Sequence, residues 1–139
     1  MIFVDTWAWV GLADRSDAYH RHATGQHREF VRRRRLYVTS DYILSETITY
    51  LYDALPPSKA QAFIQSLLAG ADAGTIQLVH LSSDQFRRAW KMRQKFADKP
   101  AISFADFTSM VVMQDLGITE IFSGDAHFEH VGLGFQLKP

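Results

Sequence analysis

Four acidic residues stand where carboxylates from distant parts of the chain could act together. Asp5 follows the apolar run Ile2–Val4 directly, and such a run is typical of a strand buried on both faces. Glu46 lies in the first turns of an expected helix, and Asp106 lies at the start of the most apolar one. Asp125 follows an expected short strand. If these segments meet at one sheet edge, the crowded carboxylates need a compensating cation.

The ligand chemistry of such a cluster favours a hard cation held by oxygen atoms, and Mg²⁺ or Mn²⁺ fits that description. The ion would lower the pKa of a bound water and stabilise the leaving oxygen. Two ions roughly 4 Å apart would do both. Sites of this kind leave places for substrate phosphate, so hydrolysis of a phosphodiester bond is the natural reaction. The sequence does not choose between one and two ions.

Each acid also has a simpler structural explanation. Asp5 could cap the helix that follows it, because Asp is a favoured N-cap residue. The pattern Ser103-x-x-Asp106 fits a capping box, and Asp125 could cap a short helix over 126–130. Glu46 could be a surface residue of an amphipathic helix. Taken together, four acids at one edge favour a metal site, and that convergence depends on the topology.

The elements that must position these acids alternate between strands and helices. Alternation of this kind predicts an α/β protein with three αβα layers and a central parallel sheet of four to five strands. The carboxyl ends of parallel strands and the N-termini of the following helices share one edge, where ligands bind. Strands are expected over 2–4, 36–39, 75–81, 120–122 and 134–137, and helices over 6–13, 18–35, 42–54, 58–73, 82–96 and 103–116.

Several residues mark where these helices begin and end. Ser40 or Asp41 can cap the helix over 42–54, and Ser82-x-x-Gln85 fits a capping box. Gly74 and Gly117 follow their helices as C-terminal glycines do. The helix over 103–116 is apolar almost all round, so we expect it to be buried.

Composition sets the outer bounds. The chain of 139 residues is expected to form a single domain over residues 1–139. Its apolar residues, 47% of the total, suffice for a hydrophobic core. The absence of cysteine excludes disulfides and thiolate metal sites. The 15 basic and 15 acidic residues balance, so the net charge does not indicate a nucleic-acid-binding protein. No apolar run approaches the roughly 20 residues of a membrane span, and Met1 opens onto a strand, so we expect a cytoplasmic protein.

Four segments together resemble a known family, the PIN-domain ribonucleases, and in particular the VapC-type toxins of bacterial type II toxin–antitoxin pairs. Any one of them is a weak motif, but their order and spacing are specific, and the resemblance covers essentially the whole chain. The segments are Phe3-Val-Asp-Thr-Trp-Ala-Trp-Val10, Leu44-Ser-Glu-Thr47, Ser103-Phe-Ala-Asp-Phe-Thr-Ser-Met110 and Ser123-Gly-Asp-Ala-His-Phe128.

The resemblance implies a cleft of acids that holds Mg²⁺ or Mn²⁺ and cleaves RNA endonucleolytically. It implies that Asp5, Glu46, Asp106 and Asp125 are the catalytic and metal-binding set. It also implies a homodimer that is neutralised by a small antitoxin covering the active site. One residue departs from the family pattern: Trp7 stands where a small hydroxyl residue is common, which could reduce activity, although Thr6 keeps a hydroxyl nearby.

Two basic zones are candidates for RNA contact. The run Arg32–Arg35 is better explained as a solvated helix end whose cations offset the helix dipole. The zone from Arg87 to Lys99 leads into the Asp106 helix and is the better candidate for RNA phosphates.

The remaining aromatic and histidine residues suggest less. Zinc is not expected, because His20 and His22 do not share a helix face and His127 with His130 lack a third ligand. His127 is expected beside the cleft. We expect Trp7, Trp9, Phe104 and Phe107 in the core, and Tyr42, Tyr50 and Tyr52 as candidate dimer contacts.

Three functions remain in view. The first is a metal-dependent RNA endonuclease acting as a toxin, with the RNA unnamed. The second is a PIN-like domain that binds RNA or a protein partner without cleaving. The third is an aspartyl phosphatase, which also places Asp after the first strand but needs a second acid at position 7, where this chain has Trp7.

Overall fold

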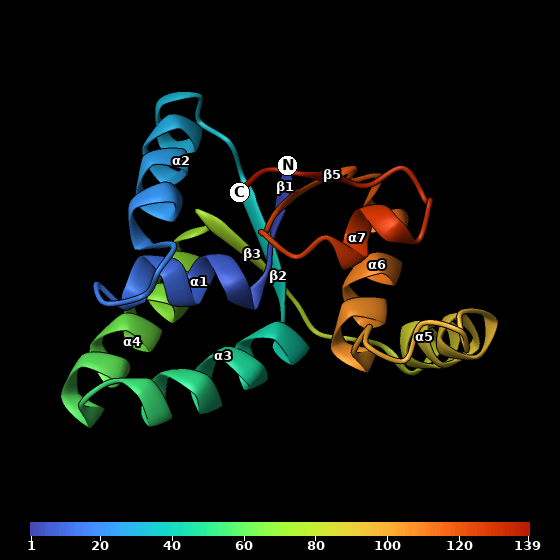
Figure 1. The fold of residues 1–139 in the computed structure, drawn as a ribbon. Helices are drawn as coiled ribbons and strands as arrows, with labels where there is room; N and C mark the ends of the chain where they lie inside the picture. The colour runs from blue at the N-terminus through green and yellow to red at the C-terminus, as the bar shows by residue number, and fades with distance from the viewer.

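The protein is described by a computed structural model of residues 1–139. Its centre is a sheet of five parallel strands in the order β3-β2-β1-β4-β5. Helices cover both faces, so the predicted three-layer α/β fold is confirmed (Figure 1). The strands are β1 (Ile2–Val4), β2 (Tyr37–Ser40), β3 (Ile76–Val79), β4 (Glu120–Phe122) and β5 (Gln136–Leu137).

The helices fall into two groups, with α1 to α4 gathered on one side of the sheet and α5 to α7 on the other (Figure 1). Their bounds are α1 (Thr6–Ala13), α2 (His20–Arg32), α3 (Asp41–Ala54), α4 (Pro57–Ala73), α5 (Ser83–Lys95), α6 (Phe104–Leu116) and α7 (His127–His130). None of them combines the length and the apolar character that a membrane-spanning helix requires.

The strand order reverses between β1 and β4. The chain runs outward from β1 to β2 and β3, and then returns to place β4 on the other side of β1. Open α/β sheets bind ligands outside the carboxyl ends of the strands at such a switch point. In this protein the two residues that follow those strand ends are Asp5 and Ser123.

Apolar side chains on both sides of the sheet hold these strand ends rigidly. Phe3 and Phe122 are fully buried, as is Phe107 on α6. The expectation that α6 is buried is confirmed, because eight consecutive residues from Asp106 to Met113 are buried. An acid at the start of such a helix has little freedom to move.

Most element bounds agree with the predictions to within two residues, and local side chains explain the differences. The helix expected over 18–35 begins at His20, because the Asp17 carboxylate accepts a hydrogen bond from the Tyr19 backbone and forms a turn. It ends at Arg32, since Arg34 adopts a positive φ of 55°. Ser40 caps α3, because its hydroxyl accepts a hydrogen bond from the Ile43 amide. The strands expected over 75–81 and 134–137 are shorter, at Ile76–Val79 and Gln136–Leu137.

Candidate active site

Asp5 and the turn that carries Asp125 are joined across the switch point. The Asp5 amide donates to the Phe122 carbonyl at 3.2 Å, because β1 and β4 are paired. The Ser123 hydroxyl donates to Asp5 Oδ2 at 2.8 Å. The same hydroxyl accepts from the Asp125 amide at 3.0 Å. The Ser123 hydroxyl therefore holds both acids, binding the side chain of Asp5 and the backbone amide of Asp125.

Asp106 reaches the same place from the first turn of α6. Ser103 and Asp106 form a capping box, with the Asp106 amide donating to Ser103 Oγ and the Ser103 amide donating to Asp106 Oδ2. The structural explanation offered for this acid is therefore confirmed. Capping does not exclude a functional role for Asp106. The capping box holds the carboxylate in one orientation at the cleft and binds only one of its two oxygens.

Glu46 differs from the other three because it is exposed. It lies on α3, which begins directly after β2. Its side chain makes no hydrogen bond or ion pair within the protein, but its charge contributes to raising the pKa of both Asp5 and Asp106. It is therefore close enough to act on the buried acids while remaining free to move.

One cleft of about 580 Å³ contains all four acids. Not one of its 13 lining residues is a lysine or an arginine, so the carboxylates face each other without a permanent cation. Asp17 adds a fifth carboxylate. The lining residues are Asp5, Thr6, Trp7, Val10, Asp17, Tyr19, Glu46, Tyr50, Ala101, Ser103, Asp106, Asp125 and His127.

Electrostatics within the cleft disfavour negative charge. Burial is the largest cause that raises the pKa of Asp5 from 3.8 to about 7, and the charge of Asp106 adds to it. The hydrogen bonds from Ser123 and from the Thr6 backbone act in the opposite direction. Burial also raises the pKa of Asp106, with the charge of Asp125 as the next cause. A bound divalent cation would reverse both shifts, since it compensates the crowded charges.

The capping explanations for the other two acids have different outcomes. Asp5 occupies the N-cap position of α1, but its side chain makes no capping hydrogen bond. Its carboxylate is instead buried, at 5% exposure, against Ser123. Asp125 Oδ1 does accept a hydrogen bond from the His127 amide at 2.9 Å and so holds the start of α7.

His127 lies deeper in the cleft than its sequence position indicated. Its Nδ1 atom is 3.1 Å from Asp125 Oδ1 and 3.6 Å from Asp106 Oδ2. The atom is buried and has no hydrogen-bond partner. The only signal in the sequence was its spacing of two residues from Asp125.

Trp7, which was expected in the core, lies at the boundary between the core and the surface. It is half-buried and lines the cleft, and its ring centroid lies 5.2 Å from that of Tyr19. A Cβ atom placed on Gly124 would come within 2.5 Å of the Trp7 indole, so the ring packs directly on that glycine. Trp9 and Phe107 are buried as expected.

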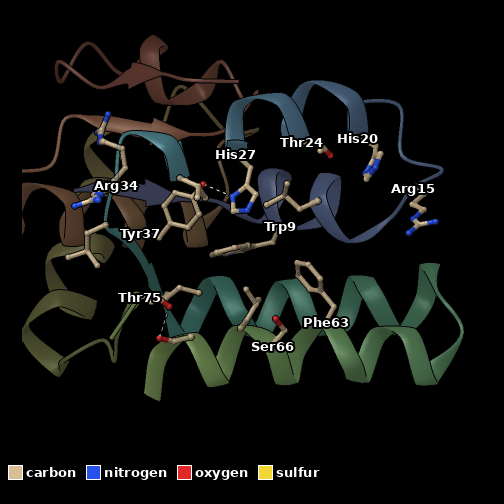
Figure 2. A pocket seen from close by; sticks show the side chains of 17 residues that line it. Trp9, Arg15, His20, Thr24, His27, Arg34, Tyr37, Phe63, Ser66 and Thr75 are labelled. Atoms are coloured by element: carbon tan, nitrogen blue, oxygen red, sulfur yellow. Dashed lines mark hydrogen bonds between the residues drawn. The ribbon is translucent and has the colours of Figure 1, made fainter. Parts of the chain in front are cut away.

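A second cavity, a groove of about 850 Å³, lies between α1, α2 and α4 (Figure 2). Figure 2 shows Trp9 from α1 and Phe63 from α4 reaching toward it, with Arg15 and Arg34 toward its ends. None of the four acids lines the groove. The two cavities approach each other at residues 15–20, because Arg15 and His20 line the groove while Asp17 and Tyr19 line the cleft.

No lysine or arginine of either basic zone lines the cleft. Arg32 and Arg33 pair with Glu29, and Arg35 pairs with Glu120. In the second zone, Arg88 forms two hydrogen bonds with Asp115, and Arg93 donates to three backbone carbonyls. In the second zone, the side chains of the exposed Arg87, Lys91 and Lys95 make no hydrogen bond or ion pair within the protein, although Lys95 Nζ lies 5.5 Å from the Phe96 ring centroid. In the first zone the same holds for the exposed Arg34.

Comparison with known proteins gives concordant results. Residues 2–133 match a family model described as the PIN domain. The chain is 31% identical to the 23S rRNA-specific endonuclease VapC20 of Mycobacterium tuberculosis, over 100% of this chain and 99% of that protein. The crystal structure of VapC20, described as a Sarcin-Ricin loop cleaving toxin, superposes with a TM-score of 0.80 at 29% identity and 95% coverage of both chains.

A more distant structure supports the fold alone. The structure of DNA-bound VapBC from Salmonella typhimurium superposes with a TM-score of 0.70 at 13% identity, covering 99% of this chain and 98% of that one.

Proposed function

This chain belongs to the PIN-domain family, and we propose that it is a metal-dependent endoribonuclease, the toxin of a toxin–antitoxin pair, with Asp5, Glu46, Asp106 and Asp125 as its catalytic and metal-binding residues. The observation that carries the proposal is the cleft itself. Four carboxylates from separate parts of the chain line it, and no lysine or arginine compensates them.

The donor set fits a divalent cation. All four proposed ligands offer carboxylate oxygens, which suit Mg²⁺ and Mn²⁺. Two of the four, Asp5 and Asp106, are buried, and burial raises the pKa of both, with the charges of neighbouring carboxylates adding to the shift. When bound, the ion supplies charge neutralisation at the phosphate and a lowered pKa for water.

The residues of the chain divide the remaining work. Ser123 keeps the Asp5 carboxylate in place, and the capping box does the same for Asp106. Held in this way, neither carboxylate has to reorganise during the reaction, which is the main advantage of a preorganised site. Glu46 is exposed and free of internal partners, so it can adjust to the substrate at the open side of the cleft.

Ribosomal RNA is the substrate we propose. The support is the 31% identity, over the whole chain, to an endonuclease specific for 23S rRNA. The cleft lacks lysine and arginine side chains, so we expect cationic contacts to phosphate from outside it, and the exposed Arg87, Lys91 and Lys95 on α5 are the candidates.

The test is cleavage of total RNA and of intact ribosomes by purified, partner-free protein. We expect discrete fragments that require Mg²⁺ or Mn²⁺, disappear with chelator and disappear in Asp106→Asn. Asp72→Asn is the matched control, because Asp72 is an exposed carboxylate on α4 outside the cleft. Mapping the fragment ends identifies the RNA. A folded wild-type protein that binds metal and RNA but leaves every RNA intact would instead establish a binding-only domain.

The antitoxin is proposed to lie in the apolar groove between α1, α2 and α4. The groove is lined by Trp9, Leu12, Val31, Phe63 and Leu67, and it carries Arg15 and Arg34. This combination suits an amphipathic segment with acidic residues. Since the groove and the cleft approach each other at residues 15–20, the same segment can continue into the cleft, where a basic side chain would meet the uncompensated acids.

A homodimer is proposed through the exposed aromatic side chains of α5. Phe86 and Trp90 stand four residues apart on one helix face and are 45% and 54% exposed. Phe86 packs on Phe104 and Tyr42, which extends the aromatic surface to α6 and α3. Sedimentation of the wild type and of Trp90→Glu tests the interface, with a dimer expected only for the wild type.

A further inference from the structure

The Nδ1 atom of His127 is a buried nitrogen without a hydrogen-bond partner. Burying a polar atom without a partner costs free energy, so such atoms are rare and call for a physical explanation. Two carboxylates lie beside this one. Asp125 Oδ1 is at 3.1 Å and Asp106 Oδ2 is at 3.6 Å.

An ordinary hydrogen bond does not account for the arrangement. Neither approach of Nδ1 to a carboxylate oxygen has hydrogen-bond geometry. Both oxygens already accept a backbone hydrogen bond, Asp125 Oδ1 from His127 and Asp106 Oδ2 from Ser103. Each oxygen keeps a second lone pair, so it is the direction of approach, and not a lack of acceptor capacity, that leaves Nδ1 without a hydrogen bond.

The spacing of the three atoms suits coordination of one ion. One ligand atom from each of Asp106, Asp125 and His127 can be chosen so that all lie within 4.8 Å of one another. Adjacent ligands of an octahedral ion with bonds of about 2.1 Å stand about 3 Å apart. The distance of 3.1 Å between His127 Nδ1 and Asp125 Oδ1 is close to that value, and the 3.6 Å to Asp106 is slightly wider.

We propose that His127 Nδ1 is a nitrogen ligand of the divalent cation held by Asp106 and Asp125, and that this ligand makes the site prefer Mn²⁺ over Mg²⁺. The inference rests on the proposed function, which already assigns a cation to this cleft. Mg²⁺ takes oxygen ligands almost exclusively, whereas imidazole suits the transition metals. The proton of the neutral imidazole then sits on Nε2, leaving a lone pair on Nδ1.

The backbone explains why this histidine can reach the ion. Asp125 Oδ1 accepts from the His127 amide, which ties the first residue of α7 to the carboxylate it accompanies. His130 is on the same short helix, but it is exposed and does not line the cleft. It offers a matched control with the same chemistry.

The experiment measures Mn²⁺ and Mg²⁺ binding by titration calorimetry on the full chain, and it reads the ligands of bound Mn²⁺ by electron spin echo spectroscopy. The variants are His127→Ala, His127→Asn, His130→Ala and Asp106→Asn, each checked for folding by urea denaturation. The expected wild-type result is Mn²⁺ affinity at least tenfold above Mg²⁺ affinity, with a coupling to an imidazole ¹⁴N nucleus.

The variants should differ in Mn²⁺ affinity and in the nitrogen coupling according to whether they keep the His127 imidazole. His127→Ala should lose the nitrogen coupling and about tenfold or more of the Mn²⁺ affinity, since even an outer partner of a ligand is worth that much. His127→Asn places an amide oxygen near the position of Nδ1, so it should bind both metals with a smaller preference and without the imidazole signal. His130→Ala should match the wild type.

Two results would overturn the inference in different ways. If Asp106→Asn abolishes Mn²⁺ binding while the wild type shows no nitrogen coupling and His127→Ala binds normally, the cation site stands and His127 is not its ligand. If Asp106→Asn binds Mn²⁺ as tightly as the wild type, the cation site of the proposed function fails, and the inference fails with it.

Discussion

The hydroxyl of Ser123 donates a 2.8 Å hydrogen bond to Asp5 Oδ2, joining two residues that are 118 positions apart in the chain. Its oxygen also accepts from the Asp125 amide. One fully buried hydroxyl thereby ties the end of β1 to the turn after β4, where the strand order reverses.

Ser123→Ala should weaken metal binding while leaving the fold intact. The change removes a hydrogen bond that lowers the pKa of Asp5, so that pKa should rise above about 7. Loss of the buried bond should lower the free energy of unfolding by about 1–3 kcal/mol, and metal affinity should fall about tenfold or more. Carboxyl ¹³C NMR titration measures the pKa. Ser83→Ala, at an exposed serine of α5, is the control. An unchanged Asp5 pKa would contradict the assignment.

The stability of the metal-free protein should fall as pH rises toward neutrality. The pKa of Asp5 is 3.8 in a solvated chain and about 7 in the fold, so the folded state binds the proton more tightly. This contribution is fully present below about pH 3.8, shrinks as pH rises and is lost above about pH 7. It amounts to about 4 kcal/mol at most.

Urea denaturation in chelator from pH 4.5 to 8.5 checks this dependence in the wild type and in Asp5→Asn. Asparagine cannot ionise, so the variant should gain stability relative to the wild type as pH rises, and the difference should level off above about pH 7. Mn²⁺ or Mg²⁺ should narrow the difference by stabilising the wild type. A difference that is constant across the range would show that Asp5 has an ordinary pKa.

Gly124→Ala should distort the turn that carries Asp125. The new Cβ would lie 2.5 Å from the Trp7 indole, which cannot move freely because it also packs near Tyr19. We expect a loss of about 1–3 kcal/mol in the free energy of unfolding, as for other overpacked sites, together with reduced cleavage. Gly25→Ala is the matched control. Nothing lies within 4 Å of its Cβ, and alanine favours the helix there.

A double-mutant cycle with Trp7→Ala identifies the cause of that loss. If the indole is responsible, its removal should relieve most of the cost of Gly124→Ala, and the two changes should couple by about 0.5–3 kcal/mol. Additive effects would mean that the glycine is needed for its backbone alone.

Arg93→Ala should loosen the loop that leads to the Asp106 helix. The Arg93 guanidinium donates to the carbonyls of Phe96, Lys99 and Ile102 and lies over the Phe107 ring. Removing a charged donor of this kind should cost about 2 kcal/mol or more in the free energy of unfolding. Urea denaturation measures it, with the exposed neighbour Gln94→Ala as control. Equal free energies of unfolding for the two variants would show that the loop keeps its conformation without the Arg93 side chain.

The positions of the four acids could be predicted because they depend on topology. Alternating strands and helices fix a parallel sheet, and the acids follow strand ends or begin helices. The resemblance to the PIN family supplied the same four residues independently. A parallel sheet of four to five strands followed from the same pattern, but the order of its strands came only from the structure. The ends of α2 depended on Asp17 and Arg34 and could not be read from periodicity.

Contacts between residues distant in the chain could not be predicted. Ser123 opens one of the four family-like segments, but nothing in the sequence shows that its hydroxyl joins two acids. The packing of Trp7 on Gly124 pairs residues from opposite ends of the chain. The groove is assembled from residues of three helices and two strands, and no single segment carries a signal for it.

The placement of β4 beside β1 has a consequence for synthesis. During synthesis Asp5 is made first. Ser123 and Asp125, which lie beside it in the fold, are made only after β2, β3 and β4. Domains fold as units while the chain lengthens. A nascent chain that stops short of these residues has no assembled cleft, so the site is completed only when most of the chain has been made.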